Sequence, residues 1–115
     1  MRQLVVVLLL LSAASAFAAE VPDFEKEVLP LLKAKCTKCH GDRSTGGRLD
    51  IRTKEAMLKG GASGPAIVPG KAEKSLLVEL VFYNEMPPKR EKNRMTQEEL
   101  QLLKAWIDGG APVKK

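Results

Sequence analysis

The chemistry-bearing side chains of this 115-residue chain gather in one short stretch, Cys36-Thr37-Lys38-Cys39-His40. The stretch holds both cysteines and the only histidine in the sequence. A thiol can form covalent bonds, and a neutral imidazole is a common metal ligand. Two thiols separated by two residues and followed at once by histidine therefore indicate a site that combines covalent attachment with metal ligation.

This spacing is the attachment signature of a c-type haem. Each thiol would add across one vinyl group of the porphyrin, and two intervening residues let one turn of backbone present Cys36 and Cys39 to neighbouring vinyls. His40 would lie beneath the iron as its proximal ligand. Thr37 and Lys38 are expected to face outward as spacers. The sequence thus predicts one covalent haem c, with its iron, as the cofactor.

Other interpretations of the two cysteines remain. A haem-free thiol–disulfide protein would use the Cys36/Cys39 pair as a redox dithiol, but such motifs need a βαβ context that this sequence lacks. It would also leave His40 unexplained. A structural zinc site needs about four ligands, and only these three soft candidates are present. A structural disulfide between residues three apart would be strained.

A low-spin haem needs a second axial ligand, and the sequence offers methionine rather than another histidine. Met57 is expected to fill the core, and Met95 to act as a hydrophobic staple before the last helix. Met86 precedes Pro87 and Pro88, whose fixed φ angles would stiffen the loop and hold the thioether at the iron. Met86 is therefore the predicted distal ligand. A His/Met pair raises the reduction potential.

Residues 1–19 show the layout of a secretory signal peptide: a basic start, an uninterrupted apolar run and a small-residue end. The apolar stretch is short for a membrane span, which favours cleavage over an uncleaved anchor. Cleavage is predicted after Ala18 or Ala19, which leaves residues 20–115 as one domain without a stable membrane span. The protein is therefore expected to be periplasmic or secreted.

The net charge of +5 is mildly basic and suits an acidic protein surface better than nucleic acid, which is not an expected partner of an exported protein. Basic residues flank both predicted ligand segments: Lys33, Lys35, Lys38, Lys89, Arg90, Lys92 and Arg94. They predict a basic rim that would steer an acidic redox partner protein. The alternative is that these charges are simply solvated.

The hydrophobic periodicity predicts an all-α fold with long loops between the helices. The first helix should begin after the N-cap Asp23 and be kinked or restarted at Pro30. A short helix should run from the Thr53 cap to Lys59. No strand pattern competes with these helices, apart from a few residues around Leu49 and Ile51.

Two further helices are predicted in the C-terminal half. One covers residues 71–82, and its expected buried face consists of Leu76, Leu77, Leu80 and Val81. The other follows a capping box formed by Thr96 and Glu99. The residues expected on its buried side are Leu100, Leu103, Trp106 and Ile107.

Several motifs, agreeing in order and spacing, resemble class I cytochromes c and more narrowly the planctomycete-type cytochrome c domain. They are "VLPLLKAKCTKCHG", "GGRLDIRTKEAMLKGGASGPAIVPGKAEKSLL", "EMPPK" and "MTQEELQLLKAWIDGGAP". The resemblance implies cytochrome c-like helices wrapped around one covalent haem, with the first and last helices crossing. It also implies a monohaem cytochrome c domain in residues 20–115.

Residue by residue, the resemblance assigns Cys36 and Cys39 to the thioether positions, His40 to the proximal ligand and Met86 to the distal ligand. Pro65 matches a proline whose carbonyl accepts a hydrogen bond from the other ring nitrogen of the ligand histidine, which would fix the ring. One departure is Gly47, where the family often has an apolar residue.

The predicted function is one-electron transfer by a His/Met-ligated haem in an exported redox chain, as a shuttle or as the electron-input subunit of an oxidoreductase complex. The protein itself is not expected to be an enzyme. A gas-reactive haem enzyme or sensor is the other haem-based alternative. It would need an open sixth site and a distal acid–base group, for which no second histidine is available.

Overall fold

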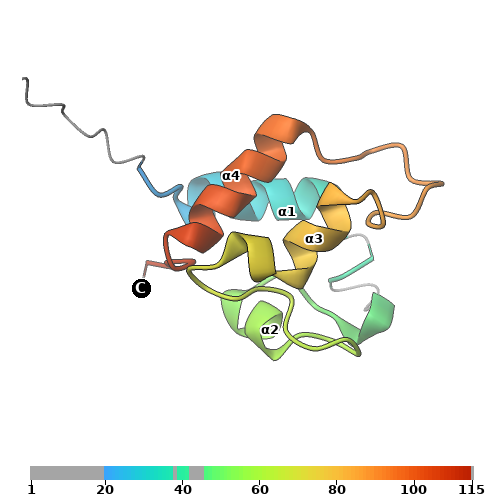
Figure 1. Ribbon diagram of the computed structural model, residues 1–115, viewed down its shortest axis with the longest axis horizontal. Coiled ribbons are helices and arrows are strands. Elements are labelled where there is room, and N and C mark those ends of the chain that lie inside the picture. The colour runs from blue at the N-terminus through green and yellow to red at the C-terminus, as the bar shows by residue number, and fades with distance from the viewer. Residues whose placement is uncertain (1–19, 38, 42–45, 115) are drawn as a thin grey trace, which may run out of the picture.

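The computed structural model describes residues 20–37, 39–41 and 46–114 as an assembly of helices joined by long loops (Figure 1). The described residues contain no strand, so the predicted all-α class is confirmed. The predicted signal peptide, residues 1–19, and the spacer Lys38 lie outside the described residues.

The N-terminal helix is built in two parts. A single π-helical turn, η1 (Phe24–Val28), runs directly into α1 (Leu29–Lys35). Asp23 caps the first part, because its carboxylate accepts a hydrogen bond of 2.9 Å from the Lys26 N–H. Pro30 lies in the first turn of α1, where a missing N–H is tolerated. The predicted cap and the predicted restart at Pro30 are both confirmed.

Five further helical elements follow among the described residues, and α4 is the longest of them. In chain order they are η2 (Gly46–Arg48), α2 (Lys54–Lys59), η3 (Ala72–Lys74), α3 (Leu76–Phe82) and α4 (Gln97–Asp108). The short helix capped by Thr53 is confirmed, since the Thr53 hydroxyl accepts a hydrogen bond of 3.1 Å from the Ala56 N–H.

The helix predicted over residues 71–82 is divided in the structure. Ser75 has an extended backbone and separates η3 from α3. Its buried hydroxyl accepts a hydrogen bond from the Val68 N–H (2.9 Å) and donates one to the Lys71 carbonyl (3.0 Å). These bonds tie the preceding loop to Ser75, so α3 begins only at Leu76.

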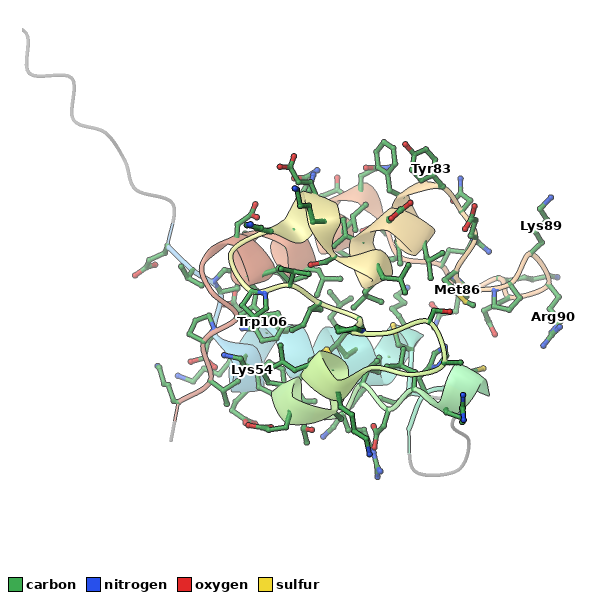
Figure 2. All side chains as sticks on the ribbon, turned by 60° about the horizontal axis from the view of Figure 1, so that its bottom comes forward. Lys54, Tyr83, Met86, Lys89, Arg90 and Trp106 are labelled. Carbon is green, nitrogen blue, oxygen red and sulfur yellow. The ribbon has the colours of Figure 1, made fainter. Side chains whose placement is uncertain are left out.

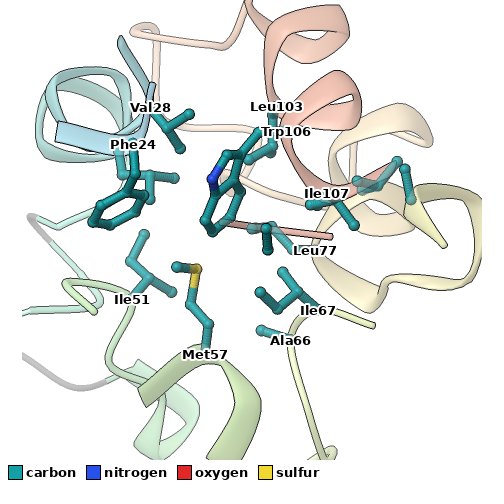
Figure 3. Close-up of a cluster of buried hydrophobic side chains, with 14 of the residues drawn as sticks. Phe24, Val28, Ile51, Met57, Ala66, Ile67, Leu77, Leu103, Trp106 and Ile107 are labelled. Atoms are coloured by element: carbon teal, nitrogen blue, oxygen red, sulfur yellow. The ribbon is translucent and has the colours of Figure 1, made fainter. Parts of the chain in front are cut away.

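The core lies where the N-terminal helix meets α4, which crosses it in Figure 1. The rings of Phe24 and Trp106 stack with centroids 5.2 Å apart. The buried indole N–H of Trp106 donates a hydrogen bond of 3.0 Å to the Pro112 carbonyl. Ile51 and Met57 pack below this pair (Figure 3), which confirms Met57 as a core residue.

Helix α4 has the predicted start and buried side. The Thr96 hydroxyl accepts a hydrogen bond of 3.2 Å from the Glu99 N–H, and the Glu99 carboxylate accepts one of 3.3 Å from the Thr96 N–H. The four residues predicted on its inner face are all buried. The capping box thus sets the start of the helix that carries Trp106.

Replacement of Thr96 by alanine should lower the free energy of unfolding by about 0.5–2 kcal/mol, because an orphan N–H of α4 loses its acceptor. Chemical denaturation followed by circular dichroism would measure the loss. Gln101→Ala, at an exposed interior position of the same helix, is the control and should leave stability nearly unchanged. Equal stability of the two variants would contradict the capping role.

Candidate haem site

A cavity of about 500 Å³ lies between the turn that carries Cys36, Cys39 and His40, helix α3 and the loop that follows α3. Cys36, Cys39, His40 and Met86 all line it. These are four of the five residues singled out in the sequence. The apolar part of the wall includes Leu49, Ile51, Ala66, Leu76, Leu77, Leu80 and Val81.

The turn that carries the two thiols and the imidazole is closed by its own backbone. The N–H groups of Cys39 and His40 both donate to the Cys36 carbonyl, at 3.2 and 3.0 Å. The His40 carbonyl in turn accepts from the N–H of the buried Ile51 at 3.0 Å. Thr37 does not line the cavity, and its hydroxyl bonds back to the Lys33 carbonyl at 3.1 Å. The turn therefore brings both thiols to one cavity, with Thr37 as a spacer.

The two cysteines are free thiols in different surroundings. Cys36 is half-buried, whereas Cys39 is exposed. Burial, and then the nearby Cys39, raise the pKa of Cys36 to about 11, although Lys35 opposes the shift. Cys36 is consequently protonated at neutral pH. Because the thiolate is the nucleophile, burial makes Cys36 a poor attacking thiol.

Met86 lies in the loop after α3, which ends at Phe82, and is bonded to the last turn of that helix. Its N–H donates a hydrogen bond of 3.0 Å to the Leu80 carbonyl. The Met86 side chain lines the cavity and is 36% exposed (Figure 2). Pro87 and Pro88 continue the cavity wall, and the Met86–Pro87 peptide bond is cis. The loop thus places a thioether on the same cavity as the imidazole of His40.

Several cavity residues were missed or misplaced by the sequence reasoning. Leu76, Leu80 and Val81 were expected in the core with Leu77, but they are only half-buried because they line the cavity, and Val78 is buried instead. Met95 is half-buried, packs against the core and also lines the cavity. Its position directly before the Thr96 cap signalled a packing residue and gave no sign of the cavity.

Pro65 does not make the contact predicted for it. The Nδ1 atom of His40 is buried and has no hydrogen-bond partner among the described residues. Pro65 itself is exposed and lies between Gly64 and Ala66, which line the cavity. The next residue, Ala66, donates to the Met57 carbonyl and accepts from the Leu77 N–H, both at 2.9 Å.

The predicted basic rim is only partly a surface feature. The side chain of Lys35 is 17% exposed and lies 3.7 Å from the Glu99 carboxylate. Arg94 is half-buried, and its guanidinium donates to backbone carbonyls of its own loop. The basic residues of the predicted rim that remain exposed are Lys33, Lys89, Arg90 and Lys92. Figure 2 shows Lys89 and Arg90 at the tip of the loop, pointing away from the protein body.

The loop that follows α2 folds back, so that the backbone of Gly64 and Pro65 lies against Gly60 and leaves no room for a side chain at that position. Gly60 ends α2 with φ of +71°, a conformation that side chains disfavour. A Cβ atom on Gly60 would collide with the Gly64 carbonyl and lie 2.6 Å from the Pro65 Cα. This glycine therefore allows the segment that carries Gly64 and Ala66 to reach the cavity.

Gly60→Ala should destabilise the protein more than Gly70→Ala does. Gly70 also has a positive φ, +82°, but a Cβ there would meet no atom within 4 Å. The Gly70 variant should lose about 1–2 kcal/mol from backbone strain alone. The Gly60 variant should lose a further ~1–3 kcal/mol because atoms are forced into occupied space. Denaturant titration would measure both, and equal losses would contradict the close approach at Gly60.

Comparison with known proteins adds to this geometry. Residues 36–90 match the family model for planctomycete cytochrome C. This segment is therefore similar to planctomycete-type cytochrome c domains. The match includes the attachment motif, the loop around Gly64 and Met86. A cytochrome c domain implies a covalently bound haem and electron transfer.

A solved structure, Kuenenia stuttgartiensis hydrazine synthase, is similar at 26% sequence identity with a TM-score of 0.47. The match covers 77% of this chain and 16% of that chain, so the present chain spans about a sixth of its length. A comparison with curated protein sequences returned no match. Within the described ranges, every helix is too short or too polar to cross a membrane.

The cavity fits a haem group in size and in chemistry. Sites for organic cofactors usually measure about 300–1,000 Å³ and are mostly apolar with a few placed polar groups. Here an apolar wall faces two thiols, an imidazole and a thioether. These are the donor types that hold haem c and its iron in cytochromes.

Proposed function

We propose that the protein is a one-electron carrier whose haem c is attached through Cys36 and Cys39 and ligated by His40 and Met86. The observation that carries the proposal is that all four side chains line one cavity, although Met86 is far from the others in the sequence. When bound, the haem supplies a reversible one-electron change between ferric and ferrous iron.

The residues of the chain hold this group and set its environment. Cys36 and Cys39 would fix it covalently, and the closed turn of residues 36–40 keeps His40 beside them. The neutral thioether of Met86 favours the ferrous form and so raises the potential. Leu76, together with the other apolar residues of the wall, would exclude water from the porphyrin face.

The two alternatives are less well supported by this site. A C-x-x-C redox pair is typical of a βαβ context, and the described residues contain no strand. A gas-reactive enzyme or sensor would need a distal acid–base group, and His40 is the only histidine in the chain. Met86 on the cavity wall favours a closed, six-coordinate iron instead.

The proposal extends to the setting of the protein. Residues 1–19 would act as a signal peptide cleaved after Ala18 or Ala19, and residues 20–115 would form the exported monohaem domain. Haem attachment of this type points to the periplasm or to secretion. The electron donor and acceptor would be other proteins, or other subunits of an oxidoreductase complex.

Replacement of Met86 tests the proposed ligation directly. The oxidised wild-type protein should show a weak band near ~695 nm that reports methionine on iron, and Met86→Ala should lose this band and have a lower potential. The reduced variant should also bind carbon monoxide rapidly, because its sixth position is open. Absorption spectroscopy and redox titration would record these changes.

Met95→Leu is the matched control, because it removes the other thioether of the cavity wall. This variant should keep the ~695 nm band. Loss of the band in Met95→Leu with retention in Met86→Ala would assign the distal ligand to Met95 and contradict the proposal.

The exposed basic residues support docking to an acidic redox partner. Charge-steered association slows as salt screens the interaction. Electron transfer from the reduced protein to an acidic acceptor protein should therefore become slower as ionic strength rises, as measured by stopped-flow absorbance. Charge reversal at exposed Lys89 should reduce the salt dependence, whereas the same change at Lys71 on η3's N-terminal flank should not. A rate that ignores ionic strength would contradict the docking proposal.

A further inference from the structure

The loop between α3 and α4 is tied together by one side chain. Arg94 is half-buried, and its guanidinium donates to the carbonyl of Pro88 at 3.2 Å. It also donates to the carbonyls of Glu91 and Asn84, each at 3.4 Å. Asn84 precedes Met86 and Pro88 follows it, so the guanidinium bridges the two flanks of the proposed distal ligand.

The backbone of the same residue is anchored to the helix that leads to the attachment motif. The Lys35 ammonium group donates to the Arg94 carbonyl at 3.0 Å and to the Asn93 side-chain oxygen at 2.7 Å. The Asn93 amide donates to the Ala34 carbonyl at 2.9 Å. Ala34 and Lys35 are the last residues of α1, immediately before Cys36. Arg94 thus connects the end of α1, next to Cys36, to the loop that carries Met86.

Backbone hydrogen bonds hold the two flanks of Met86 separately. Upstream, the Met86 N–H donates to the Leu80 carbonyl at 3.0 Å. Downstream, Pro87 and Pro88 have no N–H groups, and the Pro88 carbonyl accepts from the Glu91 N–H at 2.8 Å. The guanidinium of Arg94 adds a bond to the same Pro88 carbonyl and also reaches the Asn84 carbonyl, so it joins the two flanks.

We propose that Arg94 is a positioning residue that holds the Met86 segment against the haem cavity by clamping the backbone on both sides of it. The inference rests on the proposed Met86 ligation and assigns Arg94 a role other than partner steering. Arginine suits the role because its planar fork carries five donors and can bond several carbonyls at once. Lysine would retain the charge but present a compact point charge on a flexible stem.

Arg94→Gln and Arg94→Lys, made in the exported holoprotein, test the proposal. Both variants should weaken the ~695 nm band of the oxidised protein, because Met86 leaves the iron more often. Imidazole added to the ferric protein should bind about tenfold faster in both, which corresponds to about 1.4 kcal/mol. The measurements are made at temperatures where circular dichroism shows intact helices, so global unfolding does not contribute.

Lys92→Gln is the matched control, because it removes one positive charge from an exposed position of the same loop. It should keep the wild-type band and the wild-type imidazole rate. If Arg94→Gln does not accumulate as holoprotein, Arg94→Lys alone decides between the clamp and a pure charge effect.

A wild-type band and imidazole rate in Arg94→Lys would overturn the clamp, because only the donor fork has been removed. Wild-type behaviour of both Arg94 variants would overturn it as well, while the band of the wild-type protein would still support Met86 ligation. A wild-type protein that lacks the band would instead overturn the proposed ligation, and the positioning role with it.

Discussion

The backbone hydrogen bonds from Cys39 and His40 to the carbonyl of Cys36 place two thiols and an imidazole on one short turn. The turn continues from the end of α1, and the bond from Ile51 to the His40 carbonyl fixes its far side to the core. These three groups face one cavity. A haem site there also needs an apolar wall around the cavity and a second ligand for the iron, and the rest of the chain supplies both.

The apolar residues of the molecule form two groups, one in the buried core and one on the cavity wall. In the core, Phe24 and Trp106 are buried, and their aromatic rings stack on one another. Along α3, by contrast, Leu76, Leu80 and Val81 are half-buried because they line the cavity. A group bound in the cavity would cover this wall. Because contact with the haem would bury this apolar wall in the folded state, haem attachment and fold stability are expected to be coupled.

Features that depend on neighbouring residues could be predicted from the sequence. The caps at Asp23, Thr53 and Thr96 act over three residues, so residue types alone reveal them. The attachment motif is equally local, because the N–H groups of Cys39 and His40 both bond to the Cys36 carbonyl. The matched family segment includes the motif and Met86, in agreement with the resemblance found in the sequence.

Features that depend on distant contacts could not be predicted in the same way. Lys35 donates hydrogen bonds to Asn93 and Arg94, which come almost sixty residues later. The sequence alone gave no sign of this contact, so a lysine beside the motif was expected to be a surface charge. The contact expected between Pro65 and His40 rested on the family pattern, because it would join residues far apart in the sequence. Such contacts follow from how the helices pack and leave no periodic signal in the sequence.

Covalent haem attachment at Cys36 and Cys39 is the central claim, and extraction with acid-acetone tests it most directly. The protein would be exported from a host that has haem-attachment machinery, and its absorption spectrum recorded oxidised, reduced and after extraction. The account predicts sharp reduced bands and haem that stays with the denatured protein. A colourless protein from a host shown to mature other c-type cytochromes, or haem that leaves with the solvent, would contradict it.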